Sequence, residues 1–168
     1  SFRTIIEAVN NIKELPVNVI VIGDGRYKKT ALNLIKEKGL ENHFNFLDSF
    51  PSTEMPKFFA HADGLLVSLK KNKIFSLTIP AKIQSYLACA KPIIASIDGI
   101  GAKIETAANW GEVTPAENML VLSDRIKELM SLDKSKLYEM FMNSRTYYEK
   151  EFDRTYLLEK LEAILEDR

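Results

Sequence analysis

Short apolar runs with little polar alternation recur along this chain, and they restrict its fold more than any other feature does. They lie at residues 17–23, 44–48, 64–69, 92–97 and, more briefly, 111–113. Strands that are buried on both faces lose the polar alternation that is typical of antiparallel sheets. Segments with helical spacing of apolar residues separate the runs, so a strand-then-helix unit repeats. The sequence therefore predicts an α/β domain with a doubly wound parallel sheet.

The segments between these runs predict helices whose ends are marked by capping residues and glycine. They cover residues 2–13, 26–39, 55–62, 80–90 and 101–108, and the chain becomes all helical from residue 118, with helices at 120–130, 134–148 and 156–166. Ser52 or Thr53 is expected to cap the third helix. Gly39 is expected to follow the second helix, whose buried stripe would include Leu32. Since the chain opens on a helix rather than a strand, we expect Ser1 to lie at the cut edge of a larger fold.

Composition fits one compact domain, here residues 1–168, of which residues 118–168 are the C-terminal helices. The chain is 46% hydrophobic and 27% charged, and its 23 Lys and Arg residues balance 23 Asp and Glu residues, so no overall field attracts nucleic acid. Cys89 is the only cysteine, which excludes an internal disulfide and agrees with a cytoplasmic location. His43 and His61 have no metal-ligating partner at the right spacing, so no metal site is predicted. No apolar run approaches the roughly 18 residues that span a bilayer.

Residues 75–99 contain the best candidate for an anion site. They predict a polar loop, a helix opened by Pro80 at its first position, a turn, a buried strand and a glycine loop. This order places the N–H groups of a helix start at one end of the sheet. Thr78 adds a hydroxyl and Lys82 a cation, and together they suit a phosphate or diphosphate. The alternative is a solvated lysine on the first turn of a surface helix.

Gly23, Asp24 and Gly25 form a second candidate because they follow the first strand and open a helix. The dinucleotide-binding glycine pattern is incomplete, since Lys28 stands at its third glycine position. An ordinary strand-to-helix turn therefore remains an alternative to a ligand-facing loop. The lysines of residues 70–73 either form a solvated loop or attract the donor or membrane lipid.

The order of several short motifs makes the chain resemble one protein family along nearly its whole length. The motifs are residues 21–25 (VIGDG), 39–42 (GLEN) before 44–47 (FNFL), Pro51 with 54–56 (EMP), 62–63 (AD) before 65–69 (LLVSL), and 88–95 (ACAKPIIA). Together they resemble the C-terminal, donor-binding domain of family-four retaining glycosyltransferases with the GT-B fold. That fold has two Rossmann-like domains facing a cleft, so the resemblance implies a missing N-terminal acceptor domain.

The chain departs from this family where two glutamates usually contact the donor sugar and its ribose. Leu77 and Ser85 occupy those positions. Pro80, Lys82 and Tyr86 instead match a subgroup that resembles the fucosamine-type transferases of bacterial O-antigen, lipopolysaccharide and capsule synthesis. The resemblance implies transfer, with retention, of an N-acetylated or deoxy sugar from UDP to a lipid-linked or oligosaccharide acceptor. It also implies a cytoplasmic enzyme that works at the inner face of the membrane.

The resemblance assigns roles around the predicted helix start. The backbone N–H groups of Thr78, Ile79 and Ala81 would face the diphosphate, and Lys82 would neutralise it. Ser85 or Gln84 would make a weaker ribose contact than the usual glutamate.

Two aromatic side chains complete the candidate set. Tyr86, one turn after Lys82, would line the same face or serve as a packing aromatic. Phe50 lies in the loop of residues 48–51, which matches the segment whose backbone holds the base, although it could be a plain strand exit.

No catalytic residue and no cofactor beyond the UDP-sugar substrate is predicted in this chain, because it has no nucleophile and base pair. We expect the isolated chain to fold, to bind UDP weakly and not to transfer sugar.

Two other classes of protein domain remain open for this chain. One is another nucleotide- or NAD-binding Rossmann-like domain, and the other is a non-catalytic, flavodoxin-like interaction domain.

Overall fold

The apolar runs form five short strands in the computed structural model, which describes residues 1–166, apart from the side chains of residues 105–107. They are β1 (Val19–Ile22), β2 (Phe44–Leu47), β3 (Leu65–Ser68), β4 (Ile93–Ser96) and β5 (Gly111–Thr114). Every pairing is parallel, as the sequence predicts. The strands divide into two sheets, with the orders β1-β2 and β3-β4-β5, because no strand of residues 1–166 pairs with the second edge of β1 or β3.

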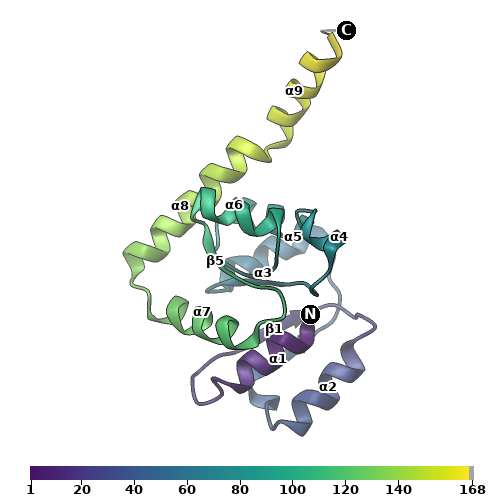
Figure 1. Ribbon diagram of the computed structural model, residues 1–168, viewed down its shortest axis with the longest axis vertical. Helices are drawn as coiled ribbons and strands as arrows, with labels where there is room; N and C mark the ends of the chain where they lie inside the picture. Colours follow the sequence, from purple (N-terminus) through teal and green to yellow (C-terminus); the bar gives the residue numbers. More distant parts are fainter. Residues whose placement is uncertain (167–168) are drawn as a thin grey trace.

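Helices surround both sheets (Figure 1). They are α1 (Phe2–Asn10), α2 (Lys28–Glu37), α3 (Met55–His61), α4 (Lys73–Ser76), α5 (Ala81–Ala88), α6 (Ile100–Ala108), α7 (Met119–Ser131), α8 (Lys134–Glu151) and α9 (Arg154–Glu166), with 3-10 turns η1 (Glu41–His43) and η2 (Ser52–Glu54). The all-helical C-terminal part thus agrees with the prediction. Figure 1 shows α9 extending away from the rest of the domain, and its residues are exposed.

Helix α1 joins the two sheets because it buries two faces. One face places Ile5, Ile6 and Val9 in a core with residues of α2 and β2. The other places Ala8, together with Ile12 just after the helix, against Ile94 of β4 and against α7. In Figure 1, α1 lies between α2 and α7. Helix α1 therefore takes part in two hydrophobic clusters, one with β2 and one with β4, although no hydrogen-bonded ladder connects the two sheets.

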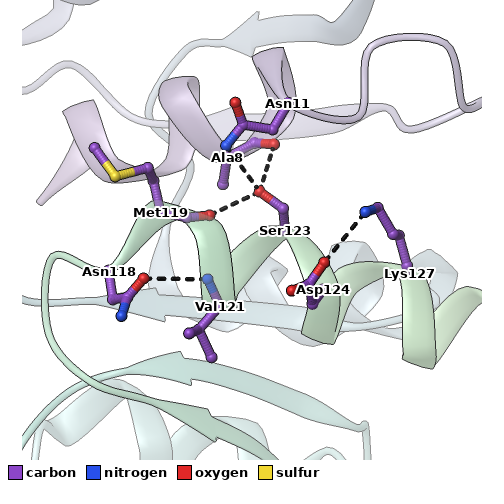
Figure 2. A network of polar contacts seen from close by, with 8 residues as sticks. All are labelled: Ala8, Asn11, Asn118, Met119, Val121, Ser123, Asp124 and Lys127. Atoms are coloured by element: carbon purple, nitrogen blue, oxygen red, sulfur yellow. Dashed lines mark hydrogen bonds and ion pairs between the residues drawn. The ribbon is translucent and has the colours of Figure 1, made fainter.

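A buried hydroxyl fixes the position of α7 against α1. The Ser123 hydroxyl donates to the carbonyl of Met119 at 2.7 Å and lies 3.1 Å from the carbonyl of Ala8. The Asn11 amide donates to the same hydroxyl at 3.3 Å (Figure 2). Asn118 caps α7, since its side-chain oxygen accepts the Val121 N–H at 3.1 Å. Polar groups buried between these helices are thus satisfied by specific partners.

Several local predictions are wrong. Leu32 is 43% exposed, because it lies about 100° around α2 from the buried Ala31. Neither Ser52 nor Thr53 caps α3, since the chain forms η2 there and Glu54 takes the cap position without a side-chain hydrogen bond. Asn72, whose side-chain oxygen accepts the Ile74 N–H at 2.8 Å, starts helix α4 where the sequence predicts the lysine loop and the polar loop that follows it.

The end of α2 agrees with the prediction, whereas its start does not. Gly39 follows the helix with φ +65°, a conformation that glycine adopts readily. The helix begins at Lys28 rather than Arg26, because the Gly25 carbonyl first accepts the Lys28 N–H at 2.9 Å in a turn.

Truncating a buried side chain of α1 should destabilise the whole domain. Ile6 is fully buried, so Ile6→Ala is expected to lower the free energy of unfolding by about 2–5 kcal/mol through lost burial and a residual cavity. Ile20→Ala is the matched control, because Ile20 is 57% exposed and should lose less than about 1 kcal/mol. Urea unfolding followed by circular dichroism measures both, and equal losses would contradict the role given to α1.

Candidate functional site

Two cavities open at the edge of the domain where the parallel strands end. The larger, of about 530 Å³, falls in the size range of small-molecule sites. It is lined by Ser1, Phe2 and Arg3 of the chain start, by Ser68, Leu69 and Lys70 at the end of β3, and by Tyr27, Phe75 and Glu117. The smaller, of about 320 Å³, is lined by Lys71, Asn72, Lys73, Ser76 and Asp98. Residues that follow the ends of strands from both sheets thus line the cavities, at the edge where open α/β sheets bind ligands.

Helix α5 starts at the same edge. A Cβ on Gly101, which follows β4, would lie 3.5 Å from the Pro80 ring. The sequence predicts Pro80 as the first helical residue of α5. In the structure Pro80 is instead the N-cap, because its ψ of 129° is extended rather than helical. Its carbonyl accepts the Ile83 N–H at 2.9 Å, whereas no acceptor among the described residues takes the N–H of Ala81 or Lys82.

Lys82 belongs to the same first turn of α5. It is exposed, and none of the carboxylates in the described part of the chain forms an ion pair with it. The first turn of α5 therefore offers two backbone donors, the positive end of a helix dipole and one cation. Such a set suits an anion, and a phosphate in particular.

Thr78 is already engaged in the turn that ends α4. Its N–H and its hydroxyl both donate to the carbonyl of Phe75, each at 3.3 Å. A diphosphate contact from this residue would require that turn to open, so its role stays a prediction. Ile79 is half-buried between this turn and Pro80.

Ser85 and Tyr86 lie one turn further along α5. The exposed Ser85 hydroxyl donates to the carbonyl of Ala81 at 3.4 Å. Tyr86 is half-buried and meets the ring of Phe59 edge-on, with ring centroids 5.0 Å apart. Burial raises the pKa of the Tyr86 phenol. The structure thus gives Tyr86 a packing contact with α3, and a ligand contact by the same ring remains a prediction.

The remaining predicted residues gather at the end of the other sheet. Gly23 has φ +120°, and its N–H donates to the carbonyl of Leu47 at 3.2 Å. The Asp24 carboxylate pairs with Lys28 at 3.4 Å, and Gly25 is exposed. The ring of Phe50, 42% exposed, stacks at a tilt on Phe58 with centroids 4.7 Å apart. Two groups of predicted residues therefore flank the strand ends, one after β1 and β2 and the other at the start of α5.

Neither cavity is lined by any of the ten residues that the sequence nominates. Some of the lining residues follow strand ends, as Tyr27, Asp98 and Glu117 do, and others belong to the chain start, to the lysine loop of residues 70–73 or to α4. The lysine loop carried a signal in the sequence, because charge is visible without the fold. The positions of Tyr27 and Glu117 could have been noted by following each predicted strand past its carboxyl end.

The histidines and Trp110 have contacts within the fold. Among the described residues, no three His, Cys, Asp or Glu side chains gather as metal ligands would. His43 and His61 each lie against a backbone carbonyl, of Val17 at 2.8 Å and of Lys57 at 2.7 Å. Trp110 is fully buried in the core around β4. No helix within residues 1–166 combines the length and the apolar character needed to cross a membrane.

A comparison with protein-family profiles shows which family the chain belongs to. The profile described as "Glycosyl transferases group 1" matches residues 2–146. The chain belongs to this glycosyltransferase family. No curated protein matches the chain in sequence.

Solved glycosyltransferase structures share its fold. HepE from Anabaena, solved in complex with UDP-glucose, has a TM-score of 0.81 at 23% identity over 99% of this chain and 45% of HepE. A glycosyltransferase from Rickettsia africae has a TM-score of 0.85 at 17% identity, over 99% of this chain and 44% of its own. The C-terminal domain of LpcC from Francisella tularensis has a TM-score of 0.72 at 21% identity, over 90% of this chain and 79% of that domain's chain. This group 1 glycosyltransferase chain thus spans less than half of the length of the first two proteins.

A methyl group at Gly99 should disturb the strand ends around the site. Gly99 has φ +78°, and a Cβ there would lie 1.9 Å from the carbonyl oxygen of Ser76. Gly99→Ala is expected to lower the free energy of unfolding by at least about 2 kcal/mol. Gly25→Ala is the matched control, because a Cβ on Gly25 would have no neighbour within 4 Å, and it should change stability by less than about 1 kcal/mol. Thermal unfolding measures both, and a Gly99→Ala variant as stable as the control would contradict the tight contact with α4.

Proposed function

We propose that this chain is the donor-binding domain of a retaining glycosyltransferase whose donor is a UDP-sugar. The observation that carries the proposal is the start of α5, where the N–H groups of Ala81 and Lys82 have no acceptor among the described residues and Lys82 adds an exposed cation on the same turn. A diphosphate fits this arrangement because it carries several negative oxygens. The family match supports glycosyl transfer, and the solved complex of HepE with UDP-glucose supports the choice of nucleotide by analogy.

The same groups would assist the reaction itself. Negative charge builds up on the diphosphate as the bond to the sugar breaks, and fixed donors near that charge lower the barrier. Lys82 and the helix start would stabilise this leaving group without any covalent step by the protein. Catalysis by this domain would then consist of holding and neutralising the diphosphate.

The donor sugar is proposed to be an N-acetylated or deoxy sugar, as in the fucosamine-type transferases. Leu77 is 63% exposed and Ser85 is exposed, so neither glutamate position supplies a carboxylate for sugar or ribose hydroxyls. A less polar sugar face suits such a surface better than a fully hydroxylated one. The acceptor is proposed to be lipid-linked or an oligosaccharide in bacterial surface polysaccharide synthesis, at the inner face of the membrane.

An acceptor-binding domain is proposed to face this one. Five large apolar residues of α9 are 44–59% exposed: Leu157, Leu158, Leu161, Ile164 and Leu165. Their charged neighbours at 159, 160, 162 and 166 carry both signs, which disfavours a membrane surface as the partner of this face. More than half of HepE lies outside the part that this chain matches, which leaves room for a facing domain of similar size.

Calorimetry with UDP tests the proposed function. The chain is expected to bind UDP, and NAD at the same concentration is expected to give no heat. Lys82→Ala should weaken UDP binding on the order of tenfold, since it removes a charge-assisted contact. Lys136→Ala is the matched control, because Lys136 is an exposed lysine in the first turn of α8, and it should bind as the wild type does.

Two outcomes would contradict the proposal. One is the absence of UDP binding by a chain that is folded by circular dichroism. The other is UDP binding that Lys82→Ala leaves unchanged, which would move the anion site away from the start of α5. Preference for NAD over UDP would favour the other nucleotide-binding class instead.

A further inference from the structure

The lysine loop, residues 70–73, runs from the end of β3 to the first residue of α4, carries three lysines and touches both cavities. Lys70 lines the larger cavity, whereas Lys71 and Lys73 line the smaller one. Residues 69–72 belong to no helix or strand, and hydrogen bonds to β4 and α4 hold only the two ends, Leu69 to Ser96 at 3.0 Å and Asn72 to Ser76 at 3.1 Å. Like charges so close together repel one another and favour open conformations of the loop. A contact from outside the loop is therefore needed to hold the lysines at the cavities.

Glu117 supplies that contact. It lies three residues after β5, and its carboxylate accepts the backbone N–H of Lys71 at 3.2 Å. The same side chain lines the larger cavity next to Lys70. A charged acceptor on a backbone donor makes a stronger hydrogen bond than a neutral one does. The carboxylate thus ties the middle of the lysine loop to the loop that follows β5.

The backbone of Glu117 is itself in an unfavourable conformation. Its φ is +63°, in the left-handed region where glycine and asparagine are common and glutamate is not. Such an outlier persists where the surroundings determine it, and it is often found at functional positions. Asn118, the next residue, is used as the N-cap of α7, which fixes the backbone on the C-terminal side of Glu117.

A second carboxylate anchors the N-terminal side. Asp98, in the loop after β4, accepts the N–H of Ala116 at 3.0 Å. The loops that follow β3, β4 and β5 are therefore connected in series by two hydrogen bonds, from Asp98 to Ala116 and from Glu117 to Lys71. Because Ala116 is fixed to the neighbouring loop, the Glu117 carboxylate has a rigid base from which to hold Lys71.

The loop that follows β4 connects the lysine loop with the start of α5. Its Asp98 lines the smaller cavity together with Ser76, Lys71 and Lys73. A Cβ on Gly99 would lie 1.9 Å from the Ser76 carbonyl oxygen, and a Cβ on Gly101 would lie 3.5 Å from the Pro80 ring. The lysine loop and the start of α5 therefore both lie near the loop that follows β4.

We propose that Glu117 is a positioning residue for the donor diphosphate, acting through the backbone of Lys71 to hold the lysine loop at the site. This inference rests on the proposed function. Glycine at this position would relieve the positive φ of Glu117 and lose the contact with Lys71.

Glu117→Gly separates the two effects because stability and binding should move in opposite directions. Relief of the positive φ should leave the melting temperature unchanged or raise it by about 2–4 °C. UDP affinity should fall about three- to tenfold, as expected for the loss of one charge-assisted hydrogen bond. Glu117→Gln keeps an oxygen acceptor of the same reach, so most of the affinity should return.

Ala90→Gly is the control variant, since Ala90 also has a positive φ, +51°, but follows α5 at the amino end of β4. It should change the melting temperature in the same direction and leave UDP affinity unchanged.

A double-mutant cycle tests whether Glu117 acts through the lysine loop. In a Lys71→Ala background, Glu117→Gly should reduce UDP affinity less than it does in the wild type. Additive losses would overturn the inference, as would a Glu117→Gly variant that binds UDP like the wild type.

Amide hydrogen exchange separates this inference from the proposed function because it needs no ligand. The Lys71 N–H should exchange faster in Glu117→Gly than in the wild type, whereas Ala90→Gly should not change it. A wild-type chain that fails to bind UDP would contradict the proposed function, and unchanged Lys71 exchange would overturn the role of Glu117.

Discussion

The packing of α1 between α2 and α7 determines the arrangement of everything else in this domain. The two parallel sheets share no ladder of hydrogen bonds, so they are held in one unit by the apolar faces of α1. Burial of side chains such as Ile6 and Val9 supplies the free energy, since apolar area removed from water is the main favourable term in folding. The Ser123 hydroxyl then fixes how α7 sits on α1. The relative position of the strand ends follows from this packing.

The candidate site depends on those strand ends. Parallel strands bring all their carboxyl ends to one edge of each sheet, and here the loops that follow β3, β4 and β5 are further tied together through Asp98 and Glu117. Gly99 lets the loop after β4 pass close to the backbone of α4. The loop after β4 consequently lies near both the lysine loop and the start of α5. A charged ligand could be held there by groups that lie far apart in the sequence.

Most of the fold could be predicted from the sequence because apolar runs and helical spacing are local signals. All five strands, their parallel pairing and the helical C-terminal part follow from them. The exposure of Leu32, the position of Pro80 and helix α4 could not be predicted, because they depend on which neighbouring element covers each residue. For the same reason the sequence did not indicate Glu117 or Asp98, whose partners Lys71 and Ala116 are 46 and 18 residues away. The site residues taken from the family resemblance remain predictions, and Thr78 and Tyr86 already have other contacts within the fold.

The most direct measurement is a titration of the isotope-labelled chain with UDP, followed by backbone amide NMR. The account predicts that the largest shifts belong to the amides of Ala81 and Lys82, with smaller ones in the lysine loop, because the diphosphate should accept hydrogen bonds from the start of α5. Shifts confined to residues 23–25 and the start of α2, with α5 unmoved, would contradict it.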